Sequence, residues 1–330
     1  MAESNHAMLT SVARMYYLDG LGQSEIASIF GVSRSTVSRL LTAARDRGVV
    51  RISVDDYDPR DTMLERALID RFGLRRAIVV RSLEGQPGNA RRTVGYFAAN
   101  IVAEWLADAH SIGVAGGRTI GQMIHFIAPR PEQAGSAPEI VQLMGTVGST
   151  PNSVDASELA RTLARRLHGS FHTINAPAFM DDARSRDLLL SHSQIRTVWS
   201  KLPTLDISIV GIGTLVDSVF ADRSVLSVAD LETLRAAGAV GEICGHFFDA
   251  RGRECRSPLQ ERVIGVELET LRRSPEVIAV TAGSARHEAV RAALVGQLVH
   301  TLVIDDAGAT AVLDGPEAVA RRTEAGYARP

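Results

Sequence analysis

The feature that most constrains this fold is a series of short apolar runs, several of which end in a glycine. The runs are rich in Ile and Val and too short for helices, so they predict buried strands. Segments with the apolar spacing of helices separate them, which predicts an α/β fold with a mostly parallel sheet covered on both faces. The predicted strands are 76–80, 111–115, 140–143, 207–210, 277–280 and 302–304, and the predicted helices between them are 63–72, 93–106, 157–167, 187–190, 229–237 and 285–294.

Residues 23–42 carry a second pattern, which fits a helix-turn-helix position by position. Ala27 is small where two helices would cross, Gly31 suits the turn, and Ser33 is a good N-cap for the second helix. An earlier helical pattern runs through Leu9, Val12, Ala13, Tyr16 and Tyr17, and residues 49–54 alternate like a strand that could form a small wing. We expect residues 1–56 to form a helix-turn-helix, winged-helix-like DNA-binding domain and residues 57–330 to form a large second domain.

The start of the second helix has the polar side chains of a DNA-reading helix. The whole chain has a formal charge of −2, but residues 34–51 contain five arginines and one acid, which gives 5 − 1 = +4 locally. Hydroxyl and guanidinium groups can contact base edges and phosphates in the major groove. The predicted DNA-binding residues are Ser33, Arg34, Ser35, Thr36, Ser38 and Arg39. The alternative is a small helical unit that binds protein or has no binding role.

A glycine-rich turn, residues 113–120, follows the strand at 111–115 and opens a helix. Backbone N–H groups and the positive end of a helix would converge there, a geometry that binds phosphate. The spacing is not that of a P-loop, which argues against nucleotide hydrolysis. Of the 36 Lys and Arg residues, one is lysine, Lys201, so any anion site must use arginines and backbone amides. The alternative is a tight turn without a ligand.

From about Leu9 to Leu313 the chain resembles the SorC/DeoR-type bacterial sugar-binding transcriptional regulators. The resemblance is carried, in order, by YYLDGLGQSEIASIFGVSRSTVSRLL, IGVAGGRTI, VQLMGTVGS, DISIVGIGTL, GAVGEICGHFFD and VIGVELETLRRSPEVIAVTAG. It implies a Rossmann-like effector domain resembling sugar-phosphate isomerases and deaminases. It also implies operator DNA and a phosphorylated sugar or polyol as partners, and a homotetramer as the assembly.

The resemblance also implies an effector site. Its phosphate cradle falls on Gly116 to Thr119 and a second ligand loop on Gly145 to Gly148. Where the family often has a lysine, this chain has Arg286, which keeps a positive charge but excludes an imine there. The implied effector-binding residues are Gly116, Gly117, Arg118, Thr119, Gly145, Thr146, Val147, Gly148, Arg223, Glu242 and Arg286. This prediction fails if the protein's own side chains leave no room in the crevice.

Other classes of protein fit the sequence less well. A sugar-phosphate isomerase or aminosugar-phosphate deaminase with an accessory helix-turn-helix domain is the alternative function, with Glu242 as a conceivable base. Cys244, His246 and Cys255 suggest packing rather than a metal site, so we expect no metal and no cofactor. From the lack of a long apolar run and the composition of the first residues we expect no membrane-spanning helix and no secretory signal, and two cysteines suit a reducing cytoplasm.

Overall fold

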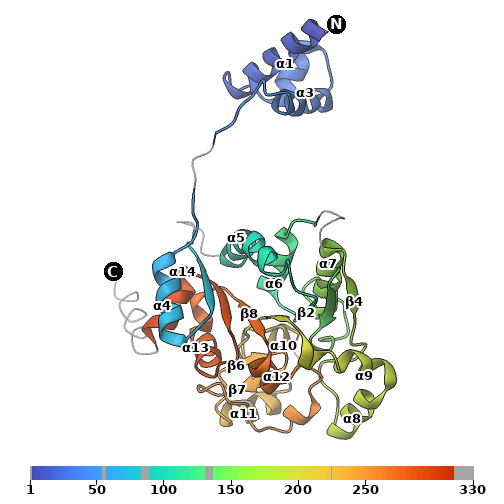
Figure 1. The fold of residues 1–330 in the computed structure, drawn as a ribbon, viewed down its shortest axis with the longest axis vertical. Coiled ribbons are helices and arrows are strands. Elements are labelled where there is room, and N and C mark those ends of the chain that lie inside the picture. Colours follow the sequence, from blue (N-terminus) through green and yellow to red (C-terminus); the bar gives the residue numbers. More distant parts are fainter. Residues whose placement is uncertain (1, 54–56, 83–88, 131–136, 224, 316–330) are drawn as a thin grey trace. The chain divides into compact units, whose positions relative to one another are not determined.

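The chain forms two compact units, Met1–Asp58 and Pro59–Pro330 (Figure 1). The structure is a computed structural model, which describes residues 2–53, 57–82, 89–130, 137–223 and 225–315. The boundary expected after residue 56 lies two residues before this division, directly after residues 54–56, which are outside the described residues.

The small unit is built from three helices around a compact apolar core. They are α1 (Ala2–Tyr17), α2 (Gln23–Phe30) and α3 (Arg34–Asp46). Gly31 adopts a left-handed φ of 63° between α2 and α3, a conformation that glycine reaches without strain. The core of the helix-turn-helix consists of Val12, Ile26, Ala27, Val37 and Leu41, with Phe30, Val32 and Leu40 partly buried against it. Tyr16 and Tyr17, which we placed in the apolar pattern of α1, are instead exposed.

The strand predicted for residues 49–54 does not form over its described part. Residues 49–53 have no strand pairing, and residue 54 lies outside the described residues. Val49 and Val50 are partly buried against Leu9, Ala13 and Ala44, so their apolar character reflects packing on α1 and α3. The described part of the small unit is therefore a helix-turn-helix without a wing.

The large unit is organised by one seven-stranded sheet in which every strand pair is parallel (Figure 1). This confirms the predicted α/β class with a parallel sheet. The strand order is β1-β9-β8-β5-β2-β3-β4, and a separate antiparallel pair is formed by β6 and β7. The strands are β1 (Arg76–Val80), β2 (Ser111–Val114), β3 (Glu139–Gln142), β4 (Ser170–His172), β5 (Ile207–Val210), β6 (Gly241–Ile243), β7 (His246–Phe248), β8 (Glu276–Val280) and β9 (Thr301–Asp305).

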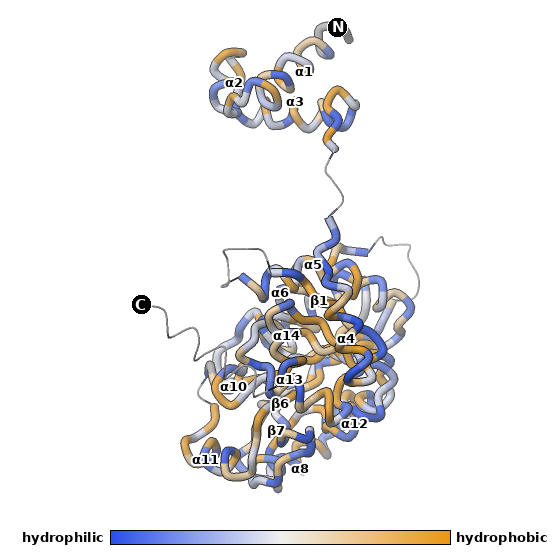
Figure 2. The backbone as a smooth tube through the Cα atoms, turned by 90° about the vertical axis from the view of Figure 1, so that its left-hand side faces the viewer, coloured by the Kyte–Doolittle hydropathy of each residue, from blue (hydrophilic) through white to orange (hydrophobic). Residues whose placement is uncertain are grey.

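The central strands β5, β8 and β9 are buried at every position because helices cover both faces of this sheet. Hydrophobic stretches, orange in Figure 2, alternate with hydrophilic ones along both units. The α-helices of the large unit are α4 (Thr62–Phe72), α5 (Ala90–Trp105), α6 (Arg118–Phe126), α7 (Ala156–Leu167), α8 (Ala183–Ser191), α9 (Ser193–Trp199), α10 (Val219–Asp222), α11 (Val228–Ala236), α12 (Leu268–Arg273), α13 (His287–Val295) and α14 (Asp306–Asp314). Three short 3-10 helices are η2 (Leu202–Thr204), η3 (Gln260–Arg262) and η4 (Ser284–Arg286).

Candidate effector site and DNA-reading helix

The order of the strands creates a crevice between β2 and β5. From β2 the chain continues to β3 and β4 at one edge of the sheet, whereas from β5 it continues to β8 and β9 toward the other edge. Neighbouring β2 and β5 therefore send their connections in opposite directions at their carboxyl ends. Ligands of open α/β sheets bind at such a switch point.

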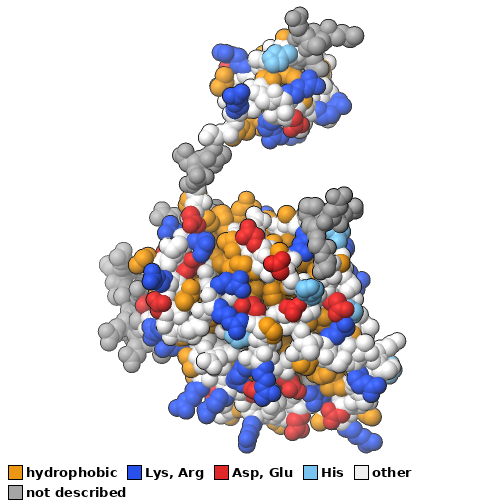
Figure 3. All heavy atoms as spheres, in the orientation of Figure 1, with side chains coloured by type: hydrophobic (Ala, Val, Ile, Leu, Met, Phe, Trp, Pro, Cys, Tyr) orange, Lys and Arg blue, Asp and Glu red, His pale blue; other side chains and the backbone are white. Residues whose placement is uncertain are grey.

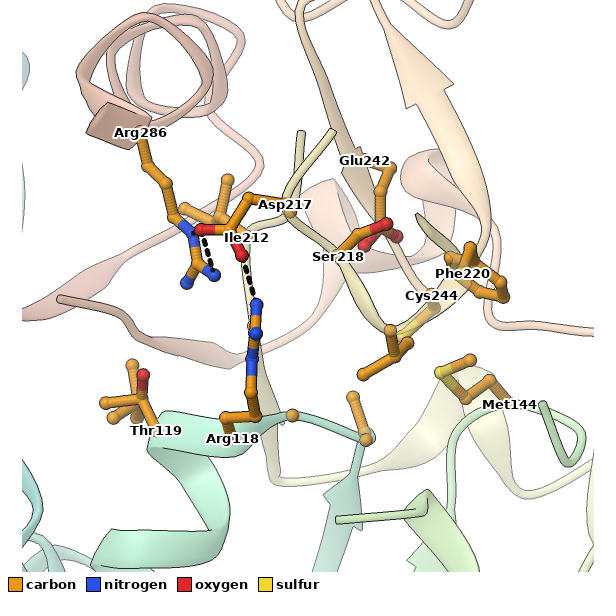
Figure 4. A pocket seen from close by; sticks show the side chains of 17 residues that line it. Arg118, Thr119, Met144, Ile212, Asp217, Ser218, Phe220, Glu242, Cys244 and Arg286 are labelled. Carbon is orange, nitrogen blue, oxygen red and sulfur yellow. Dashed lines mark hydrogen bonds and ion pairs between the residues drawn. The ribbon is translucent and has the colours of Figure 1, made fainter. Parts of the chain in front are cut away.

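A small cavity of about 40 Å³ lies at this switch point (Figure 4). The glycine-rich turn after β2 and the loop after β5 form opposite walls, and Glu242 of β6 and Arg286 of η4 complete it. Of the residues predicted to bind the effector, the cavity wall includes Gly116, Gly117, Arg118, Thr119, Glu242 and Arg286. The fold thus brings together residues up to 170 positions apart in the chain (Gly116 to Arg286, 286 − 116).

Three arginines from three different elements converge on one carboxylate, that of Asp217. Arg286 donates from Nε (2.9 Å) and Nη2 (2.7 Å) to Asp217 Oδ2. Arg118, the first residue of α6, donates to Oδ1, and Arg91 from α5 reaches Oδ2 at 3.4 Å. Figure 4 shows the Arg118 and Arg286 side chains pointing toward Asp217 from opposite sides. Three guanidinium groups therefore share the two oxygens of one carboxylate.

The ionisation of these groups follows from their burial and their pairing. Burial by itself raises the pKa of the Asp217 carboxyl, but the charges and hydrogen bonds of Arg286 and Arg118 hold it below its ordinary value. Burial lowers the pKa of the Arg286 guanidinium, and pairing with Asp217 opposes that shift. Because a guanidinium stays protonated in proteins, the cluster is charged over the whole physiological range.

Thr119 offers an unused hydrogen-bonding group at the first turn of α6. Its side chain is 3% exposed, and its Oγ1 has no hydrogen-bond partner among the residues that the structure describes. A buried polar atom without a partner is costly, so such atoms often mark a position where a ligand or water binds. Thr119 lies beside the positive end of the α6 dipole, where an anion is favoured.

Glu242 is a buried acid on the opposite side of the cavity. Gly213 of the loop after β5 pairs with the Glu242 backbone through two hydrogen bonds of 3.0 Å, and a Cβ at Gly213 would lie 2.2 Å from Glu242 Oε1. This close approach requires glycine at 213. Burial raises the pKa of Glu242 to about 7, although the Gly245 N–H and the positive charge of Arg286 act in the other direction. Near neutral pH, Glu242 can therefore either donate or accept a hydrogen bond.

The second predicted ligand loop and Arg223 have other contacts. Gly145 and Thr146 donate backbone hydrogen bonds to Ile264 and Ala176, so this stretch is tied to neighbouring segments. Arg223 donates to the carbonyls of Val147 and Thr150 and pairs with Asp155 at 3.2 Å. Arg223 and Gly148 line a separate surface hollow, and of the residues 145–148 none lines the switch-point cavity.

Two residues of the arginine cluster were not predicted from the sequence. Asp217 lies just beyond the glycine motif after β5, and a polar residue so close to a glycine-marked strand end was the available signal. Arg91 lies in the first turn of α5, far from any motif, and no sequence signal points to it.

The described residues give no sign of a metal site or a membrane span. Within them, no group of three or more His, Cys, Asp or Glu side chains is placed to hold a metal ion, and Cys244 and Cys255 are buried and free. In the same part of the chain, no helix combines the length and the apolar character needed to cross a membrane. Lys201 pairs with Glu139 at 2.7 Å, away from the cavity.

In the small unit, α3 presents the predicted DNA-binding residues to solvent. Ser33 caps the helix by accepting from the Thr36 N–H at 3.1 Å, and its hydroxyl also contacts Ser35 and Thr36. Arg34, Ser35, Ser38 and Arg39 are exposed, while Val37 points into the core. Basic side chains, blue in Figure 3, are spread over this unit with few acidic ones among them. The arrangement fits a helix whose start enters a major groove.

Comparison with known proteins agrees with the description of both the large and the small unit. Residues 59–314 match the family described as "Putative sugar-binding domain", and residues 11–47 match "Sigma-70, region 4". The deoxyribonucleoside regulator of Bacillus subtilis is 28% identical over 95% of this chain and 99% of its own. The chain belongs to the SorC/DeoR-type family of sugar-binding transcriptional regulators.

Solved structures support the same assignment for the fold. The full-length sorbitol operon regulator SorC from Klebsiella pneumoniae aligns with a TM-score of 0.73 and 26% identity over 93% of this chain and 98% of its own. A DeoR family transcriptional regulator from Listeria monocytogenes aligns with a TM-score of 0.70 and 27% identity over 76% of this chain and 98% of its own. As a member of this family the chain is a DNA-binding transcriptional regulator, and the comparisons do not support the enzyme alternative.

Proposed function

We propose that this regulator binds a phosphorylated sugar or polyol in the switch-point cavity and that this binding controls its affinity for operator DNA. The observation that carries the proposal is the first turn of α6. There, Thr119 Oγ1 is buried without a partner and the positive helix end faces a cluster of three arginines. Together these groups suit a phosphate dianion. The sugar hydroxyls would lie toward Glu242.

The proposal also assigns roles to the two domains. Residues 1–56 would contact operator DNA through the start of α3, and residues 57–330 would bind the effector and form a homotetramer in the cytoplasm. An effector that binds one arrangement of the assembly more tightly must change DNA affinity by the same coupling factor. The second loop at Gly145 to Gly148 and Arg223 would act indirectly, because their present contacts are to the protein itself.

A thermal-shift screen with matched sugars tests the proposal. A ligand that binds the folded state raises the melting temperature, so one sugar phosphate should raise it while its unphosphorylated parent should not. The same sugar phosphate should change operator affinity. Replacing Thr119 by valine keeps the shape of the side chain and removes Oγ1, which should weaken the sugar phosphate about tenfold through loss of a charged hydrogen bond.

A second threonine supplies the matched control for that variant. Thr162 on α7 lies outside the cavity, so Thr162→Val should leave both the thermal shift and operator binding unchanged. An equal thermal shift with the parent sugar would contradict phosphate recognition. A full response to the sugar phosphate in Thr119→Val would contradict the position of the cradle.

A further inference from the structure

The cavity holds an anion that belongs to the protein. Asp217 places both carboxylate oxygens among the Arg91, Arg118 and Arg286 guanidinium groups, next to the first turn of α6. A carboxylate that accepts bonds from several guanidinium groups satisfies the donors that a phosphate would use. The arginines expected to bind the effector phosphate are therefore already engaged, whereas Thr119 Oγ1 is not.

The space around Asp217 is too small for a sugar phosphate, so the open effector crevice expected from the sequence is not present in this structure. The cavity of about 40 Å³ holds a few water molecules at most, since each needs roughly 10–15 Å³. Ligand sites for small organic molecules typically enclose about 300–1,000 Å³. An effector can occupy this site only if part of the wall moves, and the wall that carries Asp217 is the loop after β5.

That loop is held by local hydrogen bonds and by the arginine contacts of the Asp217 carboxylate. Thr214 Oγ1 accepts from the backbone N–H groups of Val216 and Asp217 at 3.3 and 3.0 Å, which folds the loop into a turn. The Asp217 side chain remains 31% exposed, and Val216 is 76% exposed. The remaining hold on the Asp217 side chain is the set of arginine contacts, and these contacts are what an incoming anion competes for.

We infer that Asp217 is an internal competitor for the effector phosphate: a phosphate dianion takes over Arg91, Arg118 and Arg286 and displaces the Asp217 loop. The inference rests on the proposed function and gives Asp217 a role in it, that of a competing anion. Arg91 suits phosphate binding because its Nε is buried without a partner among the described residues. A phosphate dianion carries twice the charge of the single Asp217 carboxylate, so it is the stronger partner for three guanidinium groups.

Displacement of Asp217 would also affect residues outside the cavity. The next residue, Ser218, caps α10, accepting from the Ala221 N–H at 3.2 Å. Arg223 follows α10 and binds the carbonyl of Thr150 and the carboxylate of Asp155. Movement of the loop after β5 therefore reaches the segment between β3 and α7, and Asp217 links occupation of the cavity to the arrangement of that segment.

The test compares phosphate binding by the full-length protein and by Asp217→Asn. Inorganic phosphate is the probe, titrated at constant ionic strength against chloride, with affinity measured by calorimetry. Removing the competing charge should tighten phosphate binding about tenfold or more, the size of a charged hydrogen bond. Asp249→Asn is the matched control, because Asp249 pairs with Arg253 at 2.8 Å and lines no part of the cavity. It should bind phosphate like the wild type.

The outcomes separate this inference from the proposed function. If the wild type binds phosphate and Asp217→Asn binds it equally or more weakly, Asp217 is no competitor, and the inference fails while the proposed function stands. If neither protein binds phosphate, the phosphate site itself is wrong and the inference fails with it. If Asp217→Asn binds phosphate more tightly than the wild type and Asp249→Asn does not, the result supports both the inference and the proposed function.

A measurement on the wild type covers the case in which Asp217→Asn does not fold. Hydrogen exchange of the backbone amides of residues 214–221 should become faster when phosphate is added, because the loop loses its arginine contacts. Unchanged or slower exchange in this loop, at phosphate concentrations that saturate the protein, would overturn the inference.

Discussion

Arginine is used in opposite ways in the two units of this protein. In the small unit, Arg34 and Arg39 project from α3 into solvent. Neither side chain forms an ion pair with a carboxylate among the described residues. In the large unit, Arg118 and Arg286 are turned inward onto Asp217. Two arginines of the same type can therefore differ in whether they are available to a ligand. Under the proposed function, the arginines of α3 are available to DNA phosphates, whereas those of the cavity must first be released from Asp217.

The largest effect is expected from removing the arginines of α3. Arg34→Ala combined with Arg39→Ala should weaken operator binding about 100-fold, because each such contact is worth roughly 1–3 kcal/mol. The dependence of binding on salt should also become less steep, because fewer counterions are released. Gel-shift titrations over a range of salt concentrations measure both quantities. Phosphate binding by the large unit should be unchanged in the same protein.

An arginine elsewhere in the small unit provides the control for this pair. Arg14 is exposed on α1, so Arg14→Ala removes the same charge from another helix and should have a much smaller effect on operator affinity. If the α3 variant retained its operator affinity, or if Arg14→Ala matched its loss, α3 would not be the reading helix and the contrast between the two sets of arginines would collapse.

The next effect concerns the buried acid of the large unit and depends on pH. Glu242 has a folded-state pKa of about 7 against an ordinary value of 4.5. Below pH 4.5 the group is neutral in both states, and its contribution to stability is fully present. As pH rises toward 7, the unfolded chain ionises first, so the folded state loses stability. Glu242→Gln does not ionise, and its advantage over the wild type should grow by about 2 kcal/mol between pH 5 and pH 7.5.

Denaturant unfolding of the full chain at the two pH values measures this difference. Asp46→Asn removes an exposed acid from the small unit and should change stability by less than about 0.5 kcal/mol at either pH. Stability curves for the wild type and Glu242→Gln that run parallel from pH 5 to pH 7.5 would show that burial at β6 does not perturb this carboxyl.

The smallest effect tests the helix cap of α3. Ser33→Ala removes the hydroxyl that accepts from the Thr36 N–H, and loss of an N-cap typically costs about 1 kcal/mol. Hydrogen exchange of the α3 amides should be faster by a corresponding factor of about five. Ser38→Ala, at an exposed position inside the same helix, should leave exchange unchanged or slightly slower because alanine favours helix. Equal exchange in the two variants would assign Ser33 no capping role.

Much of the fold could be predicted because the positions of apolar residues along the chain follow which positions are buried. The runs that became β1, β2, β3, β5, β8 and β9 are mostly apolar, with polar residues chiefly at their ends, since both of their faces are covered. β4 was missed because it is a three-residue edge strand with mixed side chains, Ser170–His172. β6 and β7 were not recognised as a hairpin, because the turn between them is Cys244-Gly245 and the left-handed φ of Cys244, 54°, is unusual for that residue.

The candidate site could be predicted only in part, because its glycine turn is local in the sequence and its other residues are not. A glycine turn between a strand and a helix is local, so Gly116 to Thr119 could be assigned to an anion site from the sequence and they do line the cavity. Which side chains meet that turn depends on the strand order. Gly145 and Thr146 also follow a strand, but their backbone N–H groups donate to Ile264 and Ala176.

The two architectures, the helix-turn-helix core and the glycine-rich turn at the start of α6 could be predicted from the chain alone, because they depend on local spacing and backbone conformation. Which charges face one another depends on the fold. The order of β5 and β2 in the sheet places Asp217 among Arg91, Arg118 and Arg286, which lie in separate parts of the chain. Electrostatic pairing acts over a few ångströms in space, and no local pattern records it.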